Sequence, residues 1–134
     1  MDYKDSFLYS EDTGKIIQCF YQVYNGLGVG FSKKHYLHAL TNDLRTEGLS
    51  CEPNIAVELF YKGIDIGDFH VDILVNRQIL VYIETDNEIS SLRCTYLYNK
   101  LKSSIYEVGL LLNFGASPEH ARKQITNDKK YNPS

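Results

Sequence analysis

Residues 69–84 read FHVDILVNRQILVYIE and decide the fold. Apolar side chains recur at every second position on both sides of a polar break at residues 76–77. This period is typical of two β-strands, 69–75 and 79–84, joined by a tight hairpin turn. The same alternation over residues 55–62 predicts one more strand, so the three segments together predict an antiparallel meander.

The segments around the meander change to helical spacing. Apolar residues three and four apart predict helices over about 13–27, 33–47 and 90–106. Residues 108–114 form a continuous apolar run, which is typical of a strand buried on both faces. Because a helix precedes this run, we expect a crossover connection that pairs it parallel to strand 79–84.

The last predicted element follows Ser117, which has the character of a helix N-cap, and Pro118, which suits the first helical position. These two residues predict a short final helix. The expected fold class is therefore α/β (α+β), with a four-stranded mixed sheet of an antiparallel meander plus one parallel strand, flanked by helices. We expect a single domain over residues 13–126, a frayed N-terminus over 1–12 and a polar C-terminal tail over 127–134.

Composition limits the classes of protein. The chain has 134 residues and a formal net charge of −3, from 14 Lys plus Arg against 17 Asp plus Glu. This charge disfavours a protein that coats nucleic acid without specificity. A chain of this length buries enough surface to fold without a metal or a disulfide framework. The three cysteines are odd in number and far apart in sequence, which predicts reduced thiols.

The sequence has no apolar run long enough to cross a bilayer and no secretory signal at its start, so we expect no membrane contact and a cytoplasmic location. The chain has 11 tyrosines and no tryptophan. Tyrosine is enriched at protein interfaces, since it offers apolar area with a polar tip.

Four short motifs stand in order along the chain, which are Gly28-Val29-Gly30 through Tyr36, Tyr61-Lys62-Gly63, Asp72 within HVDILV, and the stretch GLLLNFG at 109–115. Together they resemble the GxxExxY protein family, which is assigned to the PD-(D/E)XK nuclease superfamily. The resemblance covers about residues 14–115. It implies a nuclease-like core in which carboxylates on adjacent strands hold Mg²⁺ or Mn²⁺ and a lysine beside them offsets developing charge.

The chain departs from the family where that chemistry is expected. The acid and the lysine of the third strand fall on Tyr82 and Glu84, and the family's name-giving glutamate falls on Lys33. The glutamine and tyrosine of the crossover helix fall on Tyr96 and Lys100, and a histidine of the first helix falls on Tyr24. Asp72 alone is retained.

Three hypotheses follow from these departures. The first is a catalytically inactive pseudoenzyme that acts as a binding or self-assembly module, as a homo-oligomer or with a protein partner, and that needs no cofactor. The second is a Mg²⁺- or Mn²⁺-dependent nuclease with a rearranged site, in which Asp72 and Glu84 hold the metal and Lys33 supplies positive charge. Against this second hypothesis, Lys33 and Glu84 could instead form a compensating ion pair in an abandoned site.

The third hypothesis is a nucleic-acid binder that does not cleave. Its phosphate contacts would come from four lysines, Lys33, Lys34, Lys100 and Lys102. Such contacts release counterions from the nucleic acid, so binding would weaken steeply with salt.

Overall fold

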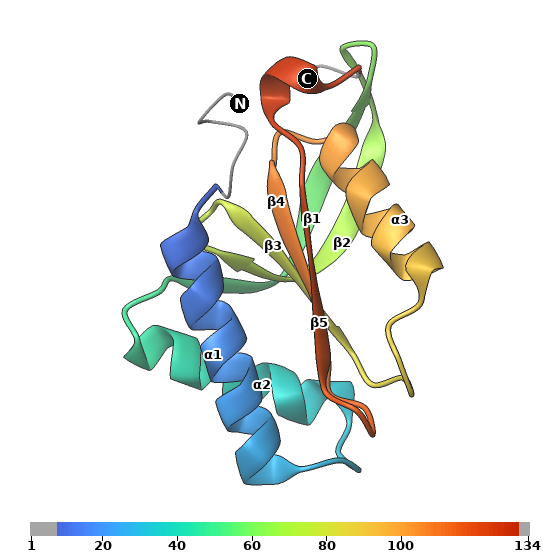
Figure 1. Cartoon of the computed structure of the whole chain (residues 1–134). Helices are drawn as coiled ribbons and strands as arrows, with labels where there is room; N and C mark the ends of the chain where they lie inside the picture. Colours follow the sequence, from blue (N-terminus) through green and yellow to red (C-terminus); the bar gives the residue numbers. More distant parts are fainter. Residues whose placement is uncertain (1–7, 132–134) are drawn as a thin grey trace.

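A computed structural model describes residues 8–131, and it contains one sheet with helices on both of its faces (Figure 1). Helices α1 (Ser10–Leu27) and α2 (Lys33–Thr46) pack together on one face. Helix α3 (Ser91–Lys102) lies on the other face, against the last two strands. The layers are therefore helix, sheet and helix.

The sheet has five strands in the spatial order β1-β2-β3-β4-β5. Strands β3 and β4 are parallel, and the other neighbours are antiparallel. This confirms the predicted meander and the crossover through α3. The strands are β1 (Cys51–Tyr61), β2 (Ile64–Val75), β3 (Ile79–Glu84), β4 (Val108–Asn113) and β5 (Glu119–Gln124).

The turn between β2 and β3 forms where the sequence predicts it. Asn76 and Arg77 both adopt positive φ, 51° and 54°, as both central residues of a type I′ hairpin turn do. The Asn76 side chain also accepts a hydrogen bond from the Ser50 backbone N–H at 2.9 Å. This turn fixes the register that brings residue 72 next to residues 82 and 83.

Two expectations about the ends of the fold are wrong. The segment after Pro118 forms β5 rather than a short helix, so the mixed sheet has five strands instead of four. Helix α1 begins at Ser10, so the expected frayed segment 1–12 overlaps its first turn, and residues 1–7 lie outside the described part. The predicted polar tail contains one short 3₁₀ helix, Asn127–Lys129.

The two faces of the sheet carry separate hydrophobic cores. The core under α1 and α2 includes three fully buried aromatic side chains, Phe20, Tyr36 and Phe114. The core under α3 is built around Leu97, Leu101 and residues of the central strands. Packing on both faces holds the start of α2 and the inner face of α3 over the same strands.

Among residues 8–131, no helix combines the length and the apolar character that a membrane crossing requires. Cys19, Cys51 and Cys94 are free thiols.

Candidate functional site

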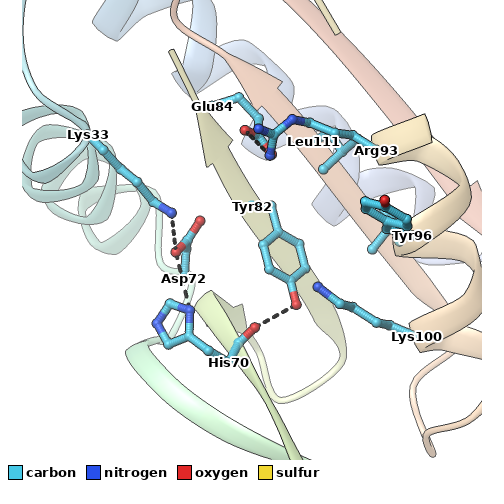
Figure 2. Close-up of a pocket in the computed structure, with 10 residues that line it drawn as sticks. Lys33, His70, Asp72, Tyr82, Glu84, Arg93, Tyr96, Lys100 and Leu111 are labelled. Atoms are coloured by element: carbon cyan, nitrogen blue, oxygen red, sulfur yellow. Dashed lines mark hydrogen bonds and ion pairs between the residues drawn. The ribbon is translucent and has the colours of Figure 1, made fainter. Parts of the chain in front are cut away.

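A polar pocket of about 290 Å³ lies where β2, β3, α3 and the start of α2 meet (Figure 2). Charged side chains that are far apart in the sequence line this pocket together. The lining residues are Lys33, His70, Asp72, Tyr82, Glu84, Arg93, Tyr96, Leu97, Lys100 and Leu111. Six of the residues singled out from the sequence are therefore brought together in one place.

Asp72 is the buried carboxylate of this pocket, with 1% of its side chain exposed. Its Oδ2 accepts a hydrogen bond from the Ile83 backbone N–H at 2.8 Å, across the β2–β3 pair. Its Oδ1 lies 2.9 Å from Lys33 Nζ and 3.7 Å from His70 Nδ1. Both carboxylate oxygens therefore already face a polar partner from this chain.

Lys33 is the first residue of α2, and its side chain reaches across to β2. The preceding Ser32 donates its backbone N–H to the His35 ring at 3.2 Å, which fixes the entry into the helix. A cation at a helix N-terminus is disfavoured by the helix dipole, so its stabilising partner must come from elsewhere in the fold. The Asp72 carboxylate is that partner.

Tyr82 stands on β3 beside Asp72 and lines the pocket. Its hydroxyl donates to the His70 backbone oxygen at 2.7 Å. Burial, and then the neighbouring Asp72 carboxylate, raise the pKa of the Tyr82 phenol above its ordinary value. The phenol therefore stays protonated, and its hydrogen bond holds it against the backbone of β2.

Glu84 is paired with α3 rather than with α2. Its Oε2 lies 2.9 Å from Arg93 Nη1, and Arg93 Nε lies 3.2 Å from Asp86 Oδ2. Burial raises the pKa of Glu84, and the Arg93 guanidinium opposes this effect. The compensating Lys33–Glu84 ion pair weighed from the sequence is therefore wrong, because each residue has a different partner, Asp72 or Arg93.

Lys100 enters the pocket from the last turn of α3. Its Nζ lies 4.6 Å from the centre of the Tyr82 ring and 5.5 Å from that of Phe69, both within the range of cation–π attraction. Burial lowers the pKa of Lys100, and the more distant Asp72 and Glu84 carboxylates oppose this effect. Tyr96, one turn earlier, lines the pocket with 53% of its surface exposed.

Three singled-out residues do not line this pocket. Tyr24 donates its hydroxyl to the Ala116 backbone oxygen at 3.2 Å. Lys34 lines a different, apolar groove beside Leu27. Lys102 lies with its Nζ 5.6 Å from the Tyr98 ring centre. The four lysines proposed as phosphate contacts are thus split, with Lys33 and Lys100 in the pocket.

Sequence reasoning missed Arg93 and His70 as members of the site. A signal for Arg93 existed, since Ser90 is a helix N-cap whose Oγ accepts the Arg93 backbone N–H at 3.1 Å. The first turn of the crossover helix follows the end of β3 closely in sequence. A cation there could have been expected to meet Glu84.

The fold and the pocket define an α/β protein whose polar groups gather over the middle of a mixed sheet, beneath its crossover helix. A scan against protein-family models matches residues 10–125 to the PD-(D/E)XK nuclease superfamily, and the chain belongs to this superfamily. Searches of curated proteins and of solved structures gave no significant match.

The superfamily implies a divalent metal, which requires a suitable set of donor atoms in the pocket. Mg²⁺ is bound through carboxylates and waters in near-octahedral geometry. Here the neighbour of Asp72 on β3 is Tyr82, and the cations Lys33 and Arg93 contact Asp72 and Glu84. Over the described chain, no three His, Cys, Asp or Glu side chains are grouped to hold a metal ion. These residues do not fit the metal.

Proposed function

We propose that this chain is a binding module built on the PD-(D/E)XK nuclease fold and that it does not use the superfamily's metal-dependent cleavage. One observation carries the proposal. Lys33 Nζ lies 2.9 Å from Asp72 Oδ1, so an ammonium group faces the one carboxylate retained from the motif. The resemblance to the GxxExxY family supports the same view, because the motif residues are replaced while the surrounding pattern is kept.

The rearranged nuclease is the competing function. It would require Asp72 and Glu84 to hold Mg²⁺ or Mn²⁺ while Lys33 supplies charge. A metal ion would have to compete with the basic partner that each carboxylate already has, Lys33 for Asp72 and Arg93 for Glu84. The ion pairs therefore favour the inactive form.

A cleavage assay tests this proposal. Labelled single- and double-stranded DNA and RNA are incubated with Mn²⁺ and wild type or Asp72→Asn, a change that leaves an acceptor for the Ile83 N–H. We expect no cleavage above the level of Asp72→Asn, and no rise in melting temperature on adding Mn²⁺, since an ion that does not bind the native state does not stabilise it. Cleavage or metal stabilisation seen in wild type and lost in Asp72→Asn would contradict the proposal.

Self-assembly is the second part of the proposal, and an apolar cluster at the tip of the β1–β2 hairpin supports it. Tyr61, Ile64 and Ile66 are 47%, 65% and 59% exposed. Lys62 Nζ lies 5.3 Å from the Tyr61 ring centre and 5.8 Å from that of Tyr131, so the exposed Tyr131 belongs to the same cluster. We propose that this hairpin-tip cluster contacts a second copy of the chain in a two-fold dimer.

Light scattering at micromolar concentration tests the dimer. We expect a mass near twice the 15.4 kDa of one chain, and a return to the monomer mass in Ile64→Glu, because a buried charge at the contact costs several kcal/mol. Leu92→Glu on α3 is the matched control, since Leu92 is also exposed but lies away from the hairpin. A monomer mass for wild type would contradict self-assembly.

A further inference from the structure

An apolar groove lies on the N-terminal helices and shares no lining residue with the polar pocket. Its volume is about 590 Å³, and it is formed by the end of α1, the loop that follows and one face of α2. Leu27, Phe31 and Ala39 give it an apolar lining, and Lys34 stands beside them. We call this surface the α1–α2 groove.

The walls of the α1–α2 groove are held in place by the fold itself. The buried Tyr36 donates its hydroxyl to the Gly28 backbone oxygen at 2.5 Å, and the Phe31 N–H donates to the same hydroxyl at 3.4 Å. A partner therefore spends little free energy on ordering the groove. Leu27 and Phe31 are nevertheless 38% and 44% exposed, so the apolar lining stays open to water.

Lys34 occupies a position in this groove that its own helix disfavours. It stands in the first turn of α2, which contains no acidic residue, and the helix dipole disfavours a cation there. The neighbouring Lys33 is compensated by Asp72. Within residues 8–131, no carboxylate forms an ion pair with Lys34. A carboxylate from another molecule would offset this cost.

The β1–β2 hairpin has the complementary feature. Its pairing sets Glu58 directly opposite Asp68, and both side chains are exposed. Like charges at directly opposed positions destabilise a pair of strands. In the described part of the chain, neither carboxylate forms an ion pair with a basic side chain. The hairpin-tip cluster, with Ile64 and Ile66, therefore lies next to uncompensated negative charge.

These two surfaces match each other in chemistry. Each joins exposed apolar side chains to a charge that its own helix or hairpin disfavours, and the two charges have opposite signs. Local rules of this kind are broken most often at functional sites. The hairpin tip and the loop between α1 and α2 lie at opposite ends of the molecule, so one copy cannot bring them together (Figure 1). Two antiparallel copies related by a two-fold axis would place each tip at the other's groove and make the contact twice.

We propose that the α1–α2 groove is the docking site for the hairpin tip of a second copy of the chain. In this contact Ile64 and Ile66 cover Leu27 and Phe31, and Lys34 faces the acidic pair on the hairpin. The inference rests on the self-assembly part of the proposed function, because it names the surface that receives the tip.

Charge reversal tests the docking site. Lys34→Glu puts an acid into the first turn of α2, and Asp68→Lys sets opposite charges across the hairpin, so each change suits its own element. We expect both variants to melt no lower than wild type. In sedimentation equilibrium, each variant alone should raise the dissociation constant of the dimer about tenfold or more, because like charges then meet at both contacts.

An equimolar mixture of the two variants should recover the dimer. In the mixed dimer, the groove of the Lys34→Glu copy receives the tip of the Asp68→Lys copy, and the other contact keeps its wild-type residues. Both contacts then join opposite charges, so we expect a dissociation constant near that of wild type. A contact between two hairpin tips would show no such recovery.

Two further variants complete the test. Phe31→Ala removes part of the apolar wall without a change of charge and should also weaken the dimer. Lys15→Glu is the matched control, since it reverses a partly exposed cation on α1 outside the groove. It should dimerise as wild type does.

Three results would overturn the inference. A dimer that Ile64→Glu dissociates, but that Lys34→Glu and Phe31→Ala leave intact, would place the tip against another surface, and self-assembly itself would stand. A mixture that stays monomeric, although each variant is folded, would remove the pairing of Lys34 with the acidic pair. A monomeric wild type would remove the inference and self-assembly together.

Discussion

Gly115→Ala is expected to lower the free energy of unfolding by about 3 kcal/mol or more, because overpacking against backbone cannot be relieved by a rotamer change. Gly115 is buried just after β4, and a Cβ at this position would overlap the Asp86 backbone oxygen and lie 2.8 Å from its carbonyl carbon. The Asn113 side chain holds that backbone in place, accepting from Asp86 N at 3.0 Å and donating to Asp86 O at 2.9 Å. The loop after β3 therefore has little freedom to retreat.

Thermal unfolding measures this effect, and a loss of this size corresponds to a fall of about 10 °C for a chain of this length. Gly14→Ala is the matched control. Gly14 is exposed in α1 with nothing near an added Cβ, so alanine there should stabilise the helix by about 0.5–1 kcal/mol. Equal melting temperatures for Gly115→Ala and wild type would contradict the close approach of Gly115 to the Asp86 backbone.

The second large effect is expected for Phe114→Ala, with a loss of about 3–5 kcal/mol in the free energy of unfolding. Phe114 is fully buried directly after β4. Its ring stacks on Tyr36 at a centroid distance of 4.3 Å and meets Phe20 edge-on at 4.7 Å. The substitution would leave a cavity between the sheet and both N-terminal helices. Denaturant unfolding followed by circular dichroism measures the loss.

Phe31→Ala provides the comparison, since Phe31 contacts the same tyrosine from outside. Its ring centre lies 6.1 Å from that of Tyr36, and 44% of its surface is exposed. We expect a loss below about 1 kcal/mol, because little apolar area returns to water. Similar losses in both variants would mean that Phe114 does not anchor α2, the helix that places Lys33 beside Asp72.

Much of the fold could be predicted because its central strands carry the signal that burial requires. Residues 69–84 carry an apolar side chain at every second position on both sides of the turn, and the turn residues Asn76 and Arg77 take the positive φ that the hairpin needs. Strand β5 carries no such signal. Its sequence EHARKQ is polar because it is an edge strand, and polar residues protect a free edge from pairing with other chains. Because Pro118 precedes this strand and suits the first position of a helix, the sequence pattern favours a helix there.

The sequence predicts most of the residues that form the candidate site, but not which of them form ion pairs with one another. Spacing along the strands places Asp72, Tyr82 and Glu84 near one another, since residues 82 and 84 share a strand face. It does not determine how far the side chains of α2 and α3 reach across the sheet. The partners of Asp72 and Glu84 depend on those distances, which arise from the packing of both cores.

The parallel pairing of β3 with β4 also has a consequence for the order of folding. The meander joins segments that are close in sequence, whereas β4 reaches β3 only after the chain between Glu84 and Val108 has crossed the sheet through α3. Contacts between distant segments form later, because closing the intervening chain costs conformational entropy before the contacts compensate it. The pocket needs side chains from both sides of this crossover, so it is complete only after the meander has formed and α3 and β4 have packed on it.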